Sequence, residues 1–145
     1  MTEIVLPSHT NALGTIFGGV VMGWIDIAAA IAAQRYARSP CVTVSIDSLH
    51  FIVPIKLGYT VSIQAQVTHV GNTSMEIEVN VVAENSITGE SQPATRAFLT
   101  FVAVDRNGKS HSITPFIPHT QEEKKRFQQA EERKKVRLQL LANQR

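Results

Sequence analysis

The sequence predicts an α+β fold in which a curled antiparallel sheet wraps around one long helix. Residues 18–37 are rich in Ala and apolar around nearly the whole helical circumference, with one charged residue, Asp26, before Arg35. The segments that follow alternate polar and apolar residues, as strands with one dry face do, and no helix separates them. A helix that is apolar on all sides needs a sheet that surrounds it, which makes an α+β domain.

The strands and turns follow from changes in the hydrophobic period. Three segments alternate with a period of two, so each predicts a strand with one dry face, whereas residues 94–104 are apolar on both faces and suit the middle of a sheet. Gly71-Asn72 and residues 106–108 mark turns. The expected elements are a short strand at residues 4–6, the helix at 18–37, and strands at 42–46, 61–67, 75–81 and 94–104.

The C-terminal segment predicts a charged helix over residues 120–141, with Thr120 as its N-cap and Glu123 three residues on. Residues 113–118 are expected to link it to the fold, so we divide the chain into a domain at 1–118 and a helix and tail at 119–145. Residues 120–145 hold eight Lys and Arg and four Glu, which makes them net positive. Because the four acids interrupt the basic residues, we expect a solvated outer helix docked at an edge or subunit interface and no nucleic-acid binding.

Composition excludes several classes of protein. A length of 145 residues suits one domain, and no apolar run is long enough to span a membrane. The only cysteine, Cys41, cannot form an internal disulfide, and the five histidines lack metal-ligand spacing, so we expect no metal. The N-terminus lacks the basic region of a secretory signal, and we expect a cytoplasmic protein.

Asp26 is the strongest candidate for chemistry. A carboxylate inside an apolar helix costs several kcal/mol unless it is paired or hydrogen-bonded. It is therefore either a general base or nucleophile in a site, or a structural residue that pairs with a buried group or faces an interface.

Gly18 and Gly19 stand at the start of the same helix. The first amides of a helix have no helical partners, so they can hold an oxyanion, although tight packing against the sheet explains the glycines equally well. Asn11 can donate and accept hydrogen bonds in the preceding loop, where a turn role is the simpler interpretation.

A second group of residues offers contacts to a phosphate-bearing ligand. The amides of the turn at Asn72, Thr73 and Ser74 could line a groove, although a plain hairpin is the simpler interpretation. The isolated basic side chains that could meet phosphates are Arg96, Arg106 and Lys109.

These pieces together resemble a known family, the hotdog-fold acyl-CoA thioesterases, and especially bacterial acyl-CoA hydrolases related to the brain acyl-CoA hydrolase. The resemblance covers about residues 4–140. Its most specific part is Thr10-Asn-Ala-Leu-Gly-Thr-Ile-Phe-Gly-Gly19, followed by Met22, Trp24 and Ile25-Asp26. Looser support comes from residues 51–58, 71–75, 101–105 and 108–109. Many relatives have an acidic residue where this chain has Tyr59.

The resemblance implies a long helix wrapped by an antiparallel sheet, dimers that pair their sheets, and three dimers in a hexamer. It implies that Asn11 and Asp26 are the catalytic pair, with Asn11 from one chain and Asp26 from the other, and that Gly18 and Gly19 donate to the thioester carbonyl. The substrate would be an acyl-CoA, hydrolysed to CoA and a free fatty acid. CoA enters as part of the substrate, so no cofactor is expected.

Three questions remain open at this stage. Asp26 could act as a general base or attack directly to form an anhydride. A hotdog enoyl-CoA hydratase or dehydratase is an alternative, although His50-Phe51 follows the helix, whereas the dehydratase motif precedes it. A non-catalytic acyl-CoA-binding regulator is the other alternative, against which Asn11 and Asp26 argue.

Overall fold

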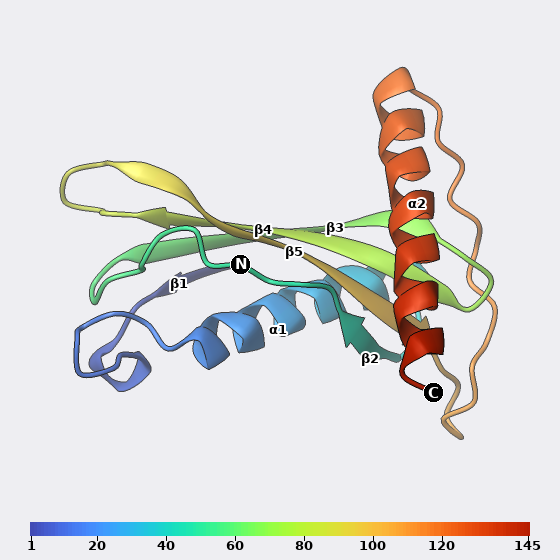
Figure 1. The fold of residues 1–145 in the computed structure, drawn as a ribbon, viewed down its shortest axis with the longest axis horizontal. Helices are drawn as coiled ribbons and strands as arrows, with labels where there is room; N and C mark the ends of the chain where they lie inside the picture. Colours follow the sequence, from blue (N-terminus) through green and yellow to red (C-terminus); the bar gives the residue numbers. More distant parts are fainter.

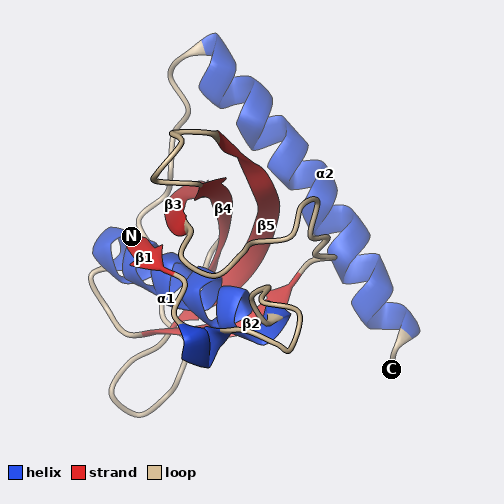
Figure 2. Ribbon diagram, turned by 90° about the vertical axis from the view of Figure 1, so that its left-hand side faces the viewer, coloured by secondary structure: helices blue, strands red, loops and turns tan.

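Five antiparallel strands form one curled sheet around helix α1 (Gly18–Ala37) in the computed structural model, which describes all 145 residues. A second helix, α2 (Gln121–Asn143), crosses the outer side of the sheet (Figures 1 and 2). The strand order is β1-β3-β4-β5-β2, with every neighbouring pair antiparallel, which confirms the predicted class. The strands are β1 (Thr2–Ile4), β2 (Cys41–Ile46), β3 (Thr60–Val70), β4 (Ser74–Glu84) and β5 (Ser91–Ala103).

Helix α1 begins and ends at the predicted residues. Arg38 ends it in the left-handed conformation, with φ at 54°, and donates its backbone N–H to the carbonyl of Gln34 at 2.8 Å. One face of the helix packs on the concave side of the sheet, against β3, β4 and β5. That face consists of Val21, Ile25, Ala28, Ala29 and Ala33, all buried.

The prediction that α1 is buried on all sides is wrong for the single chain. Met22, Ile27 and Ile31, away from the sheet, are 40%, 54% and 41% exposed. The five strands curl around one side of the helix only, so one apolar face remains open to solvent.

Strand β2 also departs from expectation. Val42 and Val44 were expected on a dry face, yet both are exposed. The strand lies at the edge of the sheet, where only β5 pairs with it, and a bulge between Thr43 and Ser45 shifts the register. Apolar residues therefore gather along an unpaired strand edge and along the open face of α1.

Strand β1 lies two residues earlier than predicted. It covers Thr2–Ile4, while Val5 is buried beyond its end and Pro7 begins a short 3₁₀ turn, Pro7–His9. Proline has no N–H to continue a sheet ladder, which explains why the extended segment stops before it.

The predicted turns at residues 71–72 and 106–108 are confirmed, as is the interior position of β5.

Helix α2 starts with the predicted N-cap. Thr120 Oγ1 accepts from the N–H of Glu123 at 3.0 Å, and Glu123 in turn accepts from the N–H of His119 at 2.8 Å. The predicted outer helix docks over the face of the sheet and not at its edge, because Ala130 is buried and Arg133 and Arg137 reach Glu76 of the interior strand β4. Neither helix combines the length and apolar character needed to cross a membrane.

Candidate active site

Asp26 projects from the middle of α1 toward β2. Its Oδ1 accepts a hydrogen bond from Thr43 Oγ1 at 2.7 Å, and no other hydrogen bond or ion pair within the chain reaches its carboxylate. The side chain is half-buried. A structural Asp paired with a buried Arg or backbone group is therefore not what the chain contains. One carboxylate oxygen remains free to accept a proton or to attack a carbon.

Thr43 is a site residue that sequence reasoning missed. It lies in a strand of alternating polar and apolar residues, between Val42 and Val44, so the sequence pattern predicts only a polar residue on the solvent side. The bulge that follows it leaves Thr43 opposite Phe101, whose buried side chain faces α1, so the Thr43 hydroxyl points to the same side. In this register the hydroxyl reaches Asp26.

Asn11 organises the loop before α1. Its Oδ1 accepts from the N–H groups of Leu13 at 2.9 Å and Thr15 at 3.2 Å, and its Nδ2 donates to Thr15 Oγ1 at 2.8 Å. Gly14, with φ at 75°, allows the chain to turn back within this loop. A side-chain amide carries two N–H donors. One of them has no acceptor within the chain and is available to a ligand.

Gly18 and Gly19 form the first turn of α1, where the amides have no helical acceptors. The N-cap residue, Phe17, offers no side-chain cap. A Cβ on Gly18 would lie 3.3 Å from the ring of Phe51, whereas one on Gly19 would meet nothing within 4 Å. A side chain at Gly18 would therefore have to displace the Phe51 ring by a few tenths of an ångström, whereas Gly19 leaves its backbone open to a ligand. Phe51, which sequence reasoning gave no role, covers this end of the helix.

Within one chain these groups do not meet. Asn11 and the first turn of α1 lie at the same end of the helix, but no hydrogen bond joins either to the Asp26 side chain. Asp26 lies seven residues beyond Gly19, roughly 10 Å along the helix at 1.5 Å per residue. The single chain thus presents two half-sites, the carboxylate in one place and the donors in another.

The hairpin residues suggested for phosphate contacts lie near the other end of α1, between β3 and β4 and beside the end of β5. Asn72 uses its carbonyl to accept from Ile113 N–H at 2.9 Å and its Oδ1 to accept from Ser112 at 3.3 Å, while the Thr73 carbonyl accepts from Ala103 N–H at 3.0 Å. The turn at residues 72–74 is therefore a hairpin in which the carbonyls of Asn72 and Thr73 and the Asn72 Oδ1 already accept hydrogen bonds.

The basic residues suggested for phosphate contacts divide into free and paired side chains. Arg106 and Lys109, in the turn after β5, are exposed, and neither side chain makes a hydrogen bond or an ion pair within the chain. Arg96, by contrast, pairs with Glu78 at 3.1 Å and is not free for a phosphate. Lys134 of α2 was not singled out, yet a Cβ on Gly71 would lie 3.1 Å from its Nζ, which places a cation beside the hairpin.

The outer side of the sheet holds a buried ionic cluster. Glu76, 3% exposed, accepts from Arg133 at 2.7 and 3.0 Å and from Arg137 at 2.9 Å. Burial acts to raise the pKa of Glu76, but hydrogen bonds from Arg133, Thr68 and Arg137 outweigh it and hold that pKa below its usual value. Every oxygen in this cluster has a partner, so it does not resemble a reactive site.

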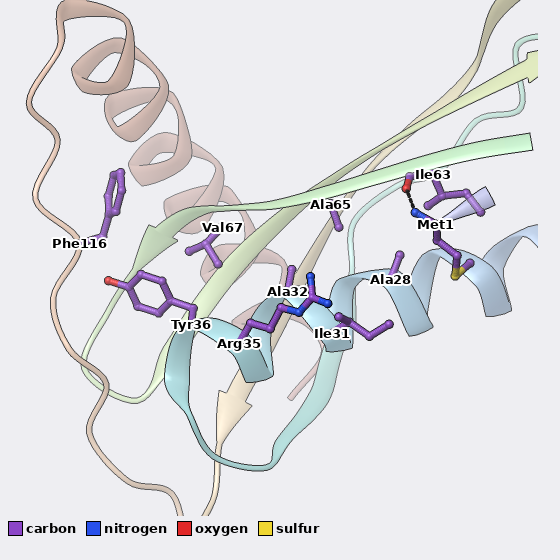
Figure 3. A pocket seen from close by; sticks show the side chains of 10 residues that line it. All are labelled: Met1, Ala28, Ile31, Ala32, Arg35, Tyr36, Ile63, Ala65, Val67 and Phe116. Atoms are coloured by element: carbon purple, nitrogen blue, oxygen red, sulfur yellow. Dashed lines mark hydrogen bonds between the residues drawn. The ribbon is translucent and has the colours of Figure 1, made fainter.

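An apolar cavity of about 480 Å³ opens between α1, β3 and the segment before α2 (Figure 3). Ile31 and Tyr36 of α1 and Val67 of β3 point into it, and the N-terminal ammonium of Met1 closes one side by donating to the Ile63 carbonyl at 2.9 Å. Neither Asp26 nor Asn11 lines this cavity, so it is separate from both half-sites. No cluster of three or more potential metal ligands is present.

Comparison with known proteins gives a consistent result. Residues 13–90 match the thioesterase superfamily. The chain is 43% identical to the uncharacterized acyl-CoA thioester hydrolase YkhA of Bacillus subtilis, over 98% of this chain and 86% of that one. It is 38% identical to acyl-coenzyme A thioesterase 11 of Mus musculus over 95% of this chain, but it spans only 23% of that longer protein.

Solved structures agree with this. A hexameric acyl-CoA thioesterase superimposes with a TM-score of 0.92 at 44% identity, covering 98% of this chain and 91% of that one. An acyl-CoA hydrolase of Staphylococcus aureus, crystallised with butyryl-CoA and CoA, gives 0.85 at 34% identity over 99% of this chain and 90% of that one.

That hydrolase was also crystallised with an Asn, an Asp or a Thr replaced by Ala, the Asn variant with CoA bound. The three replaced positions are separated by 15 and 17 residues. The same separations divide Asn11, Asp26 and Thr43 in this chain.

Proposed function

This chain belongs to the thioesterase superfamily and is an acyl-CoA thioesterase with the hotdog fold; from this premise we propose that Asp26 and Asn11 perform the hydrolysis in a site built by two copies of the chain. The observation that carries the proposal is the Asp26 carboxylate. It stands in an apolar helix with one hydrogen bond, from Thr43, and one free oxygen. The substrate is an acyl-CoA, and the products are CoA and a free fatty acid.

Asp26 supplies the proton acceptor or the nucleophile. As general base it takes a proton from water while the water oxygen bonds to the thioester carbon, the C–S bond breaks, and the departing CoA sulfur receives a proton. As nucleophile its free oxygen bonds to the same carbon, CoA leaves, and water then hydrolyses the anhydride. Thr43 keeps the carboxylate in one rotamer in both routes. Neither route needs a metal or a bound cofactor.

Asn11 and the first turn of α1 supply the hydrogen-bond donors. The carbonyl oxygen gains negative charge as the carbon is attacked, and fixed N–H groups aimed at it lower the barrier. The free N–H of Asn11 Nδ2 and the open amides of Gly18 and Gly19 are such donors. We infer that Asn11 orients the carbonyl or the attacking water.

Two copies are needed because a single chain holds the parts about 10 Å apart along α1. A two-fold axis beside the open face of α1 would set the first turn of one helix against the middle of the other, and would cover Met22, Ile27 and Ile31. The hairpin at residues 72–74 would then lie on the Asp26 side of the composite site. We propose that Asn72, Thr73, Ser74, Arg106 and Lys109 contact the CoA portion there.

Self-association is expected of this chain, since its structural neighbours include hexameric thioesterases. We propose dimers that pair their β2 edges, three to a hexamer. The exposed Val42 and Val44 on an unpaired strand edge support this arrangement, because such an edge is a template for pairing. A hydratase or a non-catalytic regulator is not favoured, because relatives of Bacillus subtilis, Mus musculus and Homo sapiens are named as thioester hydrolases or thioesterases.

Subunit complementation tests the composite site. Asn11→Ala and Asp26→Ala chains are unfolded and refolded as a mixture, and the release of free CoA thiol is measured with a panel of substrates from acetyl-CoA to palmitoyl-CoA. With random pairing, about half the dimers are mixed and each has one intact site, so activity returns to roughly a quarter of that of the wild type. If chain exchange is verified and the mixture never exceeds the mean of the two variants, the shared site is excluded.

A further inference from the structure

Strand β2 carries Thr43 but has little to hold it in place. It is six residues long, lies at the sheet edge, pairs only with β5, and contains a bulge immediately after Thr43. A bulge allows a short strand to change register, and a change of one residue turns a side chain to the opposite face. The hydrogen bond from Thr43 to Asp26 therefore depends on something that anchors the far end of β2.

The anchor is on α2, on the other side of the sheet. Asp47 directly follows β2, and Arg137 binds both of its carboxylate oxygens, from Nε to Oδ1 at 2.8 Å and from Nη2 to Oδ2 at 2.8 Å. The Asp47 N–H also donates to the Phe98 carbonyl of β5 at 2.9 Å. A planar guanidinium bound in this two-pronged manner fixes the direction as well as the distance of the carboxylate.

Arg137 is itself fixed to the centre of the sheet. Its Nη2 reaches Glu76 Oε2 of β4 at 2.9 Å, and Glu76 is buried and held by Arg133 and Thr68 as well. Arg137 therefore ties the end of an edge strand to an interior strand. Its hydrogen bond with Asp47 is the largest cause of a raised pKa of Arg137, so the cation stays charged throughout the working range of pH.

We propose that Arg137, through Asp47, is a positioning residue for the thioesterase reaction: it holds β2 in the register at which Thr43 meets Asp26. This inference rests on the proposed role of Asp26. Strand β2 lies between the two helices, with Thr43 facing α1 and Asp47 facing α2. The charged C-terminal helix thereby acts on the reaction from the side of the sheet opposite to the site.

The first test is the Arg137→Ala enzyme, assayed as the intact oligomer. We expect kcat to fall by up to the factor that Thr43→Ala causes, with KM for acyl-CoA unchanged, because Arg137 touches no substrate. Arg137→Lys keeps a charge and one hydrogen bond and should recover part of the loss. If Arg137→Ala does not fold, Asp47→Asn weakens the same link with less change in volume and takes its place.

A double-mutant cycle distinguishes positioning from general destabilisation. If Arg137 acts through Thr43, adding Arg137→Ala to Thr43→Ala causes no further loss of kcat. Losses that multiply would show that Arg137 acts elsewhere and would overturn the inference.

Two arginines of the same helix serve as matched controls. Arg133→Ala removes a partner of Glu76 without touching Asp47, so it should lower Tm and leave kcat unchanged. Arg126, which pairs only with Glu122 on the surface, should change neither. A loss of kcat in Arg133→Ala equal to that in Arg137→Ala, or an unchanged kcat in a folded Arg137→Ala enzyme, would refute the inference. Failure of the proposed function is a separate result, since it would appear as full activity in Asp26→Ala.

Discussion

The two long helices differ in how the carboxylates associated with them are hydrogen-bonded. Helix α1 is apolar and contains one carboxylate, Asp26, which has one neutral hydrogen-bond donor and a free oxygen. Helix α2 is highly charged, and its inner side chains join a cluster in which Glu76 is saturated by two guanidinium groups and a hydroxyl. A carboxylate with unused hydrogen-bonding capacity is available for chemistry. One with every lone pair occupied is a structural element, and burial alone does not tell the two apart.

The largest effect should come from the carboxylate with the free oxygen. Asp26→Ala should lower kcat by about 10²–10⁴-fold, the usual contribution of general base catalysis, or by more. Its Tm should stay the same or rise slightly, because a half-buried charge with a single hydrogen bond is removed. Steady-state kinetics and thermal unfolding of the same preparation test both parts. A fully active Asp26→Ala enzyme would disprove the catalytic role of Asp26, and a variant unable to fold would show that Asp26 is structural.

The converse is expected for the saturated carboxylate. Glu76→Ala leaves Arg133 and Arg137 without their buried partner, and breaking a buried ion pair in this way typically costs about 3–5 kcal/mol of stability. The link from Arg137 to Asp47 remains but its tie to β4 is lost, so kcat per folded enzyme should fall no further than in Arg137→Ala and far less than in Asp26→Ala. Urea unfolding and active-site-normalised kinetics measure the two effects. A variant that stays as stable as the wild type but loses its activity would reverse the comparison.

Low pH should weaken the ionic cluster that Glu76 forms with Arg133 and Arg137 of α2. The pKa of Glu76 is lowered in the folded chain, so the stability it contributes is fully present above the unfolded-state pKa, about 4.3 for Glu, and is lost as pH falls through the folded-state value below it. The free energy of unfolding should therefore drop more steeply below pH 4.3 in the wild type than in Glu76→Gln, which does not titrate there. Parallel curves for the two proteins would show that Glu76 is not the group responsible.

The smallest effect belongs to a pair on the outer surface of the same helix. Arg126 and Glu122 are joined at 3.0 Å, four residues apart, and both are exposed. Such pairs contribute about 0.3–0.5 kcal/mol, so Arg126→Ala should shift the urea midpoint slightly and leave activity unchanged. A loss as large as that from Glu76→Ala would mean that burial does not set the difference between the two pairs.

Much of the fold was predictable because it depends on local pattern. The Ala-rich apolar segment that begins at Gly18 places α1 at its observed ends, and Thr120 with Glu123 marks the start of α2. The lone charge of Asp26 in an apolar helix singles it out, and the motif around Asn11 and Gly18 indicates the family. Each of these signals lies within a few residues of the feature that it predicts.

The rest was decided by the tertiary structure. A pattern shows which residues avoid water but not what covers them, so it did not reveal that Ile27, Ile31 and Val44 remain open in the single chain. Thr43 meets Asp26 because the pairing of β2 with β5 sets it opposite Phe101, on the side of the sheet that faces α1. Arg133 and Arg137 reach carboxylates 57 and 90 residues away in sequence. Local sequence specifies periods and caps, whereas pairing across such distances depends on strand order and register, which exist only once the sheet has formed.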